Sequence, residues 1–154
     1  MKIASILPYK ENYTFKNAGA VSLWVSDFMK YSSHKNSITV FGNTIARKYL
    51  SKNYVNINLK SINSKISSST KEYTNNLIKH LTKNHFDIVE IHNRPIMVED
   101  FVKNISSKII LYLHNDPKTM KGSKSKNEKL FLLENVDKIV FISEWVKKQF
   151  FSNL

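Results

Sequence analysis

The sequence predicts one α/β domain in which helices flank a parallel β-sheet. The chain has 154 residues, which is the usual length of a single domain with its own core. Hydrophobic residues make up 42% and occur along the whole chain, a composition typical of globular proteins. Short β-rich runs alternate with segments of helical periodicity, and this alternation is typical of a parallel sheet covered by helices.

Six short runs rich in β-branched and apolar residues are predicted to be the strands. The last three are as apolar as strands buried on both faces should be, so we expect them to form the centre of the core. In chain order the six predicted strands are residues 2–7, 37–41, 54–59, 86–91, 108–113 and 137–142.

The helices between the strands are predicted from the spacing of apolar side chains, which recur every three or four residues on one helical face. The first helix is marked by Val21, Trp24, Val25, Phe28 and Met29. The later helices are marked by Tyr73, Leu77 and Leu81, by Met97, Phe101 and Ile105, by residues 130–133, and by Trp145, Val146 and Phe150.

Two of these helices are preceded by the pattern of a capping box, in which a serine and a glutamate three residues later bond each other's backbone amides. The boxes are Ser69 with Glu72 and Ser125 with Glu128. Segments 43–53 and 63–69 are polar and irregular, so we expect them to be mobile loops. Repeats and low-complexity linkers are absent, and residues 1–154 are predicted to be one domain.

The composition bears on the partners and the compartment. The net charge of +12 comes almost wholly from scattered lysines, with only Arg47 and Arg94 as arginines. An anionic partner and a bias of AT-rich coding both explain this charge. Because nucleic-acid-binding motifs are missing, we expect no nucleic acid as partner. There is no cysteine, which excludes disulfides and thiolate metal sites, and the apolar run before Pro8 is too short for a signal peptide, so a cytoplasmic location is expected.

Two similar loops follow the fourth and fifth predicted strands. They read His92-Asn93-Arg94-Pro95 and His114-Asn115-Asp116-Pro117. In open parallel sheets the ligand binds outside the carboxyl ends of the strands. The two loops therefore predict a ligand site at one edge of the sheet.

The residue types in these loops suit a sugar or a phosphate. A histidine can act as hydrogen-bond donor, acceptor or general base, and the planar guanidinium of Arg94 suits phosphate or carboxylate. A structural interpretation stays open for each: His92 and His114 could bond backbone carbonyls at the strand ends, and Asp116 could be a turn residue before Pro117. We predict that His92, Asn93, Arg94, His114, Asn115 and Asp116 contact substrate.

The segment Asn17-Ala18-Gly19-Ala20 lies directly before the first predicted helix. Amides at a helix start favour an anion, and a glycine lets the backbone approach a phosphate, although Gly19 could equally just begin the helix. Motifs for nicotinamide binding, P-loops, zinc proteases and serine hydrolases are absent. A metal held by His92, His114 and Asp116 is not expected, because their spacing is not a known ligand pattern.

These residues together resemble a known family. The segments that carry the resemblance are the first strand with residues 17–20, then 86–95, 109–117 and 137–144. They resemble the amino-terminal domain of retaining GT-B glycosyltransferases of the group-1 class, most closely members for lipopolysaccharide or spore-coat polysaccharide synthesis. The resemblance implies a Rossmann-like half of a GT-B fold, and transfer of a sugar from a nucleotide-sugar to a glycan or lipid-linked acceptor without a cofactor or metal.

The resemblance also implies individual roles. His114 matches a histidine beside the reacting sugar, and Asn17 and Gly19 match the turn that approaches the donor diphosphate, although Ala18 stands where the family usually has a second glycine. Ser143 and Glu144 are interpreted as an N-cap and a favourable first-turn charge.

We expect a further, donor-binding domain with a Glu-x7-Glu element to be missing after Leu154, and the fragment alone to be inactive. Peripheral contact with an anionic membrane is a further expectation, since the domain is basic. Two alternatives remain: a nucleotide-sugar epimerase of GT-B architecture, and a stand-alone sugar- or phosphate-binding module.

Overall fold

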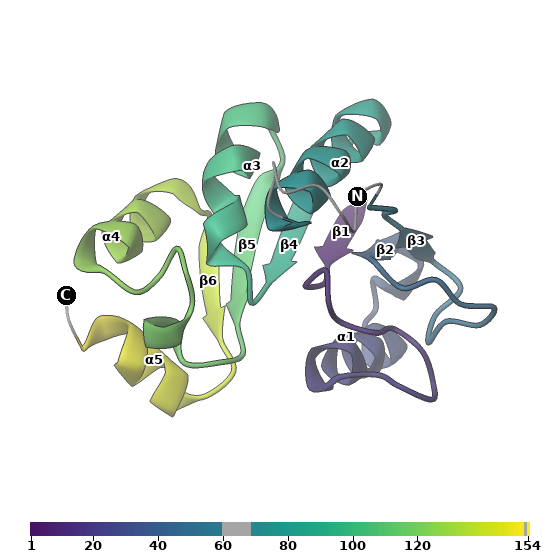
Figure 1. Cartoon of the computed structure of the whole chain (residues 1–154), viewed down its shortest axis with the longest axis horizontal. Coiled ribbons are helices and arrows are strands. Elements are labelled where there is room, and N and C mark those ends of the chain that lie inside the picture. Colours follow the sequence, from purple (N-terminus) through teal and green to yellow (C-terminus); the bar gives the residue numbers. More distant parts are fainter. Residues whose placement is uncertain (60–68, 153) are drawn as a thin grey trace.

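The computed structural model describes residues 1–59, 69–152 and 154. Over these residues the chain forms six strands and five α-helices, joined in places by short 3-10 helices (Figure 1). In chain order they are β1 (Ile3–Ile6), α1 (Ala20–Tyr31), η1 (Lys35–Ser37), β2 (Ile38–Gly42), β3 (Tyr54–Asn56), α2 (Ser69–Asn84), β4 (Ile88–His92), η2 (Pro95–Met97), α3 (Val98–Asn104), β5 (Lys108–Leu113), η3 (Pro117–Thr119), α4 (Lys126–Asn135), β6 (Lys138–Phe141) and α5 (Glu144–Phe151).

All six strands lie in one parallel sheet, in the order β3-β2-β1-β4-β5-β6. This is the strand order of Rossmann-like sheets. The first three strands are added toward one side of the sheet and the last three toward the other, so the order reverses between β1 and β4. The predicted α/β fold with a parallel sheet is therefore confirmed. Because the strands are parallel, the ends of β1, β4, β5 and β6 meet at one edge, and the reversal between β1 and β4 opens the crevice in which such sheets bind ligands.

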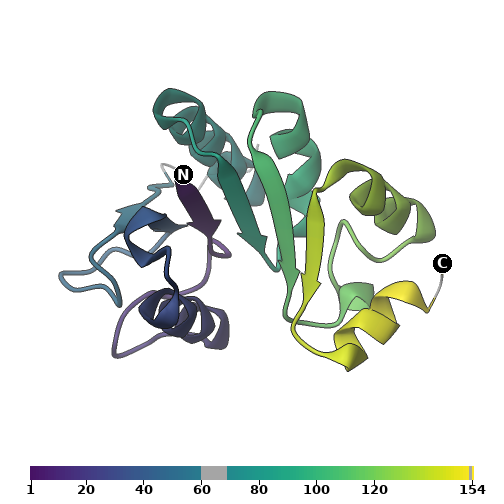
Figure 2. The same cartoon turned by 180° about the vertical axis from the view of Figure 1, so that it is seen from behind.

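The two faces of the sheet are covered differently. On one face α2, α3, α4 and α5 pack their apolar side chains onto the sheet, with Tyr73, Leu77, Phe101, Leu132 and Phe150 fully or almost fully buried. On the other face α1 packs Val21, Val25 and Met29 against β1 and β2. Seen from behind, β4, β5 and β6 run side by side with α1 beside them (Figure 2). This second face carries the polar residues of the site described below.

The alternation of side chains along the strands explains this division. The register pairs Ser5 of β1 with Glu90 of β4, and His92 of β4 with Tyr112 of β5. Since side chains alternate between the faces of a strand, Glu90 and His92 point to the same side, and their neighbours Val89 and Ile91 point to the other. Val89 and Ile91 are fully buried in the larger apolar core.

Most predicted elements are confirmed, with small differences at the ends. The predicted third strand, residues 54–59, is shorter and covers only Tyr54–Asn56. The capping box at Ser125 and Glu128 is present, with Glu128 N–H donating to Ser125 Oγ over 3.2 Å and Ser125 N–H donating to Glu128 Oε2 over 2.8 Å. Helix α2 begins at Ser69 itself, so the prediction that Ser69 precedes this helix as its cap is wrong by one position.

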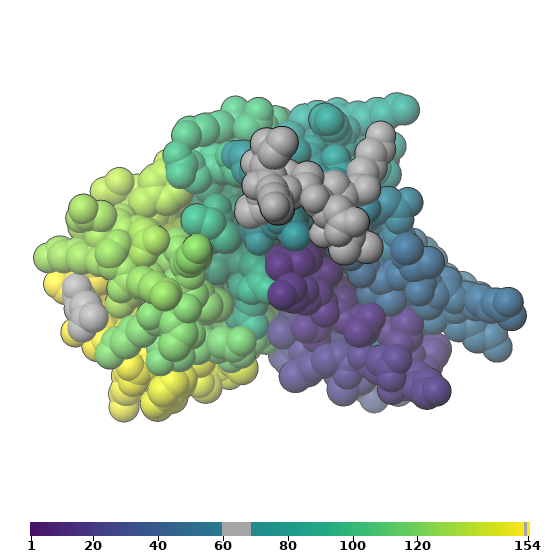
Figure 3. All heavy atoms as spheres, viewed as in Figure 1, coloured from purple at the N-terminus to yellow at the C-terminus, as the bar shows by residue number. Residues whose placement is uncertain are grey.

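The predicted irregular loops have different outcomes. Segment 43–53 contains no helix or strand, as expected, but residues 63–68 of the other predicted loop lie outside the described residues. The space-filling view shows the early part of the chain (purple to blue) and the late part (green to yellow) joined in one continuous body (Figure 3). Among the described helices, none is long and apolar enough to cross a membrane.

Candidate functional site

The two predicted histidines lie together at the carboxyl edge of the sheet. His92 ends β4 and is fully buried, and His114 follows β5 and is partly exposed. His92 Nδ1 lies 3.0 Å from His114 Nε2, and His92 Nε2 lies 3.0 Å from Ser5 Oγ on β1. The ring nitrogens of His92 thus bond two side chains, so the alternative that this histidine caps a strand end through backbone carbonyls is not what the structure shows.

Aromatic rings surround the histidine pair. The Trp24 ring, which comes from α1, has its centroid 5.8 Å from that of His92 and 5.1 Å from that of His114. Tyr112 stacks on His92 with the two centroids 4.7 Å apart. These rings remove the imidazoles from water, and burial disfavours a charged imidazole. Burial therefore lowers the pKa of His114 to about 4.

The pKa of His92 is lowered well below its ordinary value, first by burial and then by the neighbouring His114. Both imidazoles are therefore neutral at pH 7, and each carries one N–H and one acceptor nitrogen.

A buried carboxyl group continues the chain of hydrogen bonds into the sheet. Glu90 is only 6% exposed. The Tyr112 hydroxyl donates to Glu90 Oε1 over 3.3 Å, and Ser5, which the register pairs with Glu90, acts on the same carboxyl group. Burial raises the pKa of Glu90, whereas its bonds with Tyr112 and Ser5 act in the opposite direction.

The direction of these hydrogen bonds depends on the charge of Glu90. If Glu90 is ionised it can only accept, and a Ser5 hydroxyl that donates to it accepts in turn from His92 Nε2–H. His92 Nδ1 is then the acceptor nitrogen, and His114 Nε2–H donates to it. This sequence leaves His114 Nδ1 without a proton. In that arrangement the nitrogen of His114 that does not contact His92, Nδ1, is a hydrogen-bond acceptor.

Asn93 holds the two strand-tip loops together. Its backbone lies in the left-handed region with φ 52°, which asparagine adopts more readily than most residues. Its Oδ1 accepts from the backbone N–H of His114 over 2.7 Å and from that of Asn115 over 3.2 Å. The predicted residue Asn93 is thus part of the framework that positions His114.

Arg94 lies apart from the histidine pair. Its Nη1 donates to the carbonyl of Asn93 over 3.0 Å, and its guanidinium lies 5.9 Å from the centroid of the Tyr9 ring. It lines a cavity of about 260 Å³ together with Thr70 of α2 and Lys121. This cavity is on the side of α2, whereas Trp24 and the histidines are on the side of α1.

The other two residues of the second loop have simpler positions. Asn115 is exposed. Asp116 caps η3, because its carboxylate accepts from the backbone N–H of Lys118 over 3.0 Å. Asp116 therefore has the turn role that the sequence left open, and contact with substrate stays a prediction for both residues.

The start of α1, where a donor phosphate is predicted, already holds a carboxylate. Glu11 Oε1 accepts from the backbone N–H of Ser22 over 3.1 Å. Gly19 is the N-cap of α1, and a side chain at this position would collide with the Glu11 carboxyl group. Asn17 is exposed. The start of α1 thus already binds an anion, the Glu11 carboxylate of the chain itself.

Several residues of the site were not predicted from the sequence, namely Ser5, Glu90, Trp24, Tyr112 and Glu11. A signal existed for two of them, because Ser5 and Glu90 are polar residues inside predicted strands, and the strand of Glu90 was predicted to be buried on both faces. Ser143 was interpreted correctly, since its Oγ accepts from Val146 N–H over 3.2 Å as the N-cap of α5. In the part of the chain that the structure describes, no three His, Cys, Asp or Glu residues form a group that could hold a metal.

Comparison with known proteins gives one informative relative. No protein-family model matches the chain. The chain is 27% identical over 152 residues to a protein of Bacillus subtilis (strain 168) named "Putative glycosyltransferase YtcC". The similarity covers 96% of this chain and 35% of that relative, so the chain spans about a third of the relative's length.

Proposed function

We propose that this chain forms the acceptor-side half of the active site of a glycosyltransferase with GT-B architecture and retaining stereochemistry. The observation that supports it most is the neutral His114 at the carboxyl edge of the sheet, in a chain that resembles a named glycosyltransferase over 96% of its length. In the proposed reaction an acceptor hydroxyl oxygen replaces the diphosphate at the anomeric carbon of a nucleotide-sugar. The proposed setting is the synthesis of cell-surface polysaccharide.

The site suits this reaction because His114 can bind a sugar hydroxyl. Its Nδ1 accepts a hydrogen bond from the hydroxyl, and Asn93 fixes its backbone. A neutral imidazole loses less solvation on meeting a sugar than a charged one. Trp24 provides an apolar wall beside it. We assign the chain's contribution to positioning the sugar and to preorganised dipoles, and we expect neither a cofactor nor a metal.

The donor diphosphate is proposed to bind at the amino-terminal end of α1, near Asn17 and Gly19. Since the Glu11 carboxylate accepts from Ser22 N–H in this structure, the diphosphate must displace it. The nucleotide itself is proposed to bind a second α/β domain of the whole protein.

Product analysis tests the proposed function. The protein expressed from its whole reading frame is incubated with a panel of nucleotide-sugars and with extracted glycan and lipid-linked acceptors. Formation of a glycoside on the acceptor supports the transferase. Release of an epimerised free sugar would identify an epimerase instead, and binding of sugar without any turnover would identify a binding module.

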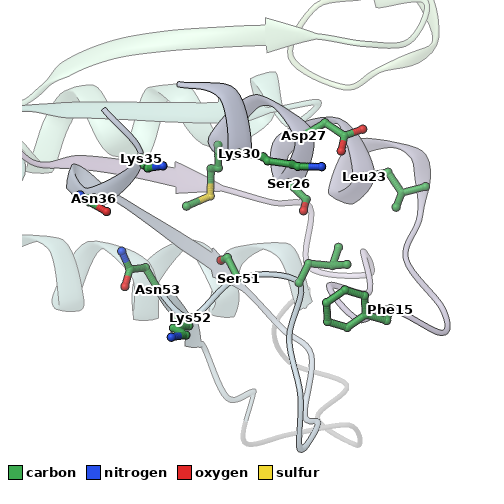
Figure 4. Close-up of a pocket in the computed structure, with 12 residues that line it drawn as sticks. Phe15, Leu23, Ser26, Asp27, Lys30, Lys35, Asn36, Ser51, Lys52 and Asn53 are labelled. Carbon is green, nitrogen blue, oxygen red and sulfur yellow. The ribbon is translucent and has the colours of Figure 1, made fainter. Parts of the chain in front are cut away.

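Peripheral contact with an anionic membrane is proposed at the outer side of α1. Large apolar side chains are exposed there or close by, with Phe15 75%, Tyr31 79% and Ile45 85% exposed. Phe15 lines a cavity of about 530 Å³ that also contains Lys30, Lys35 and Lys52, and Asp27 is the one acidic residue among its described lining residues (Figure 4). Exposed aromatic and apolar side chains next to lysines suit the interface of an anionic bilayer.

Liposome sedimentation tests this surface. Vesicles with 30 mol% phosphatidylserine should retain the protein at about 0.1 M salt, where screening is moderate, and Phe15→Ser with Tyr31→Ser should release it. Equal retention on vesicles of pure phosphatidylcholine would remove the proposal. Leu130→Ser is the matched control, since Leu130 is exposed on α4.

A further inference from the structure

The cavity that contains Arg94 is formed by segments that are distant in sequence. Tyr9 comes from the loop after β1, Arg94 from the loop after β4, Thr70 from the first turn of α2, and Thr119 and Lys121 from the segment after β5. It lies beside Asn93, which also lines it. The cavity is therefore at the ligand-binding edge of the sheet, next to the residue that holds His114.

The charged side chains that line this cavity are positive. Its described lining residues include two cations, Arg94 and Lys121, and no acidic residue. The acidic residues Glu99 and Asp100 of α3 pair with Lys103 at 2.5 Å and Lys71 at 2.6 Å. They line a neighbouring cavity, which Thr70 and Lys121 also border. The described lining of the Arg94 cavity itself thus carries two positive charges and no carboxylate.

Arg94 is held in place but is not saturated. Within the described residues its guanidinium donates one hydrogen bond, to the carbonyl of Asn93, although a guanidinium has five N–H donors. The Tyr9 ring lies 5.9 Å from it, a contact that restricts its orientation. A fork that is held by the fold and keeps free donors suits a planar array of oxygen acceptors.

The lining matches a phosphate group. A phosphomonoester carries about −1.5 to −2 charges at pH 7 and three acceptor oxygens. Arg94 and Lys121 supply two positive charges, and the Thr70 hydroxyl lies in the same cavity as a further donor. A carboxylate would leave one of the two cations unmatched. The number of charges therefore favours phosphate.

We propose that this cavity binds a phosphate group of the acceptor. The assignment of this phosphate to the acceptor rests on the proposed function, whereas the phosphate subsite itself does not. Asn93 connects the two parts of the site, because it lines the cavity and also bonds the backbone of His114. A phosphate bound at Arg94 lies on the α2 side of Asn93, and the sugar that carries it would have to extend past Asn93 to reach His114. The acceptor is thus a phosphorylated sugar or a sugar on a diphosphate-linked carrier.

Titration of the chain with inorganic phosphate, followed by ¹⁵N chemical shifts at constant ionic strength, tests the subsite directly. The shifts should concentrate on Tyr9, Thr70, Arg94 and Lys121. Arg94→Gln and Lys121→Gln should each weaken phosphate binding about tenfold or more, since each removes a charged hydrogen bond. Lys121 is exposed, so its variant keeps the test valid if Arg94→Gln unfolds.

The matched control is Lys108→Gln, which removes the same charge at the opposite, amino-terminal edge of the sheet, where Lys108 begins β5 and is exposed. It should leave phosphate affinity unchanged. Equal weakening by Lys108→Gln, or shifts that spread over all lysines or are absent, would overturn the subsite. Methyl phosphate and methyl diphosphate then identify the source: tighter binding of the first indicates a phosphorylated sugar, and tighter binding of the second a diphosphate carrier.

Kinetics of the whole protein separate this inference from the proposed function. Arg94→Gln should raise KM for the acceptor and leave the Kd of the nucleotide-sugar unchanged. A raised Kd of the nucleotide-sugar with an unchanged acceptor KM would overturn the assignment to the acceptor. If phosphate binds at Arg94 but no sugar is transferred, the proposed function fails and the phosphate subsite stands.

Discussion

His92 Nδ1 and His114 Nε2 lie 3.0 Å apart, and this contact joins a buried strand end to the exposed rim of the sheet. Through Ser5 the contact continues to the carboxyl group of Glu90. A histidine with only a packing role would not need a hydrogen-bonding partner at each of its ring nitrogens, as His92 has. The order of donors and acceptors determines whether the free nitrogen of His114 accepts from a ligand or donates to it.

The first prediction concerns the charge of His114. Its ring protons should titrate with a midpoint of about 4, well below the ordinary histidine value of about 6.5, because burial disfavours the imidazolium. The unfolded chain binds this proton at higher pH than the folded chain, so the contribution of His114 to stability is complete above about pH 6.5 and falls as the pH decreases toward 4. A ¹H NMR titration measures the midpoint, and a value near 6.5 would contradict the burial of this ring.

The second prediction concerns Glu90. In Glu90→Gln we expect the amide oxygen to accept from Tyr112 and the amide nitrogen to donate to Ser5, so that Ser5 donates to His92 and each following bond reverses. His114 should then carry its proton on Nδ1 and no longer accept at that nitrogen. Imidazole ¹⁵N shifts distinguish the two tautomers.

Glu99→Gln is the control for this change, because Glu99 is an exposed acid on α3. An unchanged tautomer in Glu90→Gln would show that the carboxylate does not set the direction. In the whole protein Glu90→Gln should lower kcat about tenfold or more, because a proton on His114 Nδ1 removes the hydrogen bond that this nitrogen accepts from the sugar.

The third prediction concerns Glu11. If the donor diphosphate binds at the start of α1, Glu11→Ala removes a competing anion and should tighten the binding of uridine diphosphate about threefold to tenfold. The same variant should lower the free energy of unfolding by about 1 kcal/mol, since it removes an acceptor from the first turn of the helix. Calorimetry measures both. Glu134→Ala, at an exposed position of α4, should change neither, and weaker nucleotide binding in Glu11→Ala would place the diphosphate elsewhere.

The fourth prediction concerns Asn93. Asn93→Ala leaves the backbone N–H groups of His114 and Asn115 without their acceptor, and it places a less suitable residue at φ 52°. The free energy of unfolding should fall by about 1–3 kcal/mol. Asn93→Asp keeps an acceptor oxygen and should lose clearly less. Equal losses in a denaturant titration would show that Oδ1 does not hold the two loops together.

Much of the fold could be predicted from the sequence because its signals are local. The apolar runs gave the six strands, and the side-chain spacing at Val21, Val25 and Met29 gave α1. The box at Ser125 and Glu128 also needs only neighbouring residues. By contrast, the order of the strands depends on which loops pack together, and the sequence alone did not determine it.

The site could be predicted in part for the same reason. The similar loops at His92 and His114 identified the edge of the sheet, but not that the two rings bond each other. That contact depends on the register of β4 and β5. The roles of Ser5 and Glu90 come from contacts across strands that are far apart in sequence. Arg94 was expected beside the histidines, yet its side chain turns toward α2, because the backbone changes direction at Asn93.

Turnover of the His114→Ala variant of the whole protein, measured with its best nucleotide-sugar, tests the central claim most directly. The matched control is His34→Ala, because His34 is exposed and lies before η1. The account predicts a loss of kcat of about tenfold or more in His114→Ala, from the lost hydrogen bond to the sugar, with unchanged circular dichroism and with wild-type turnover in His34→Ala. Wild-type turnover in a folded His114→Ala protein would contradict the assignment of His114 to the reacting sugar.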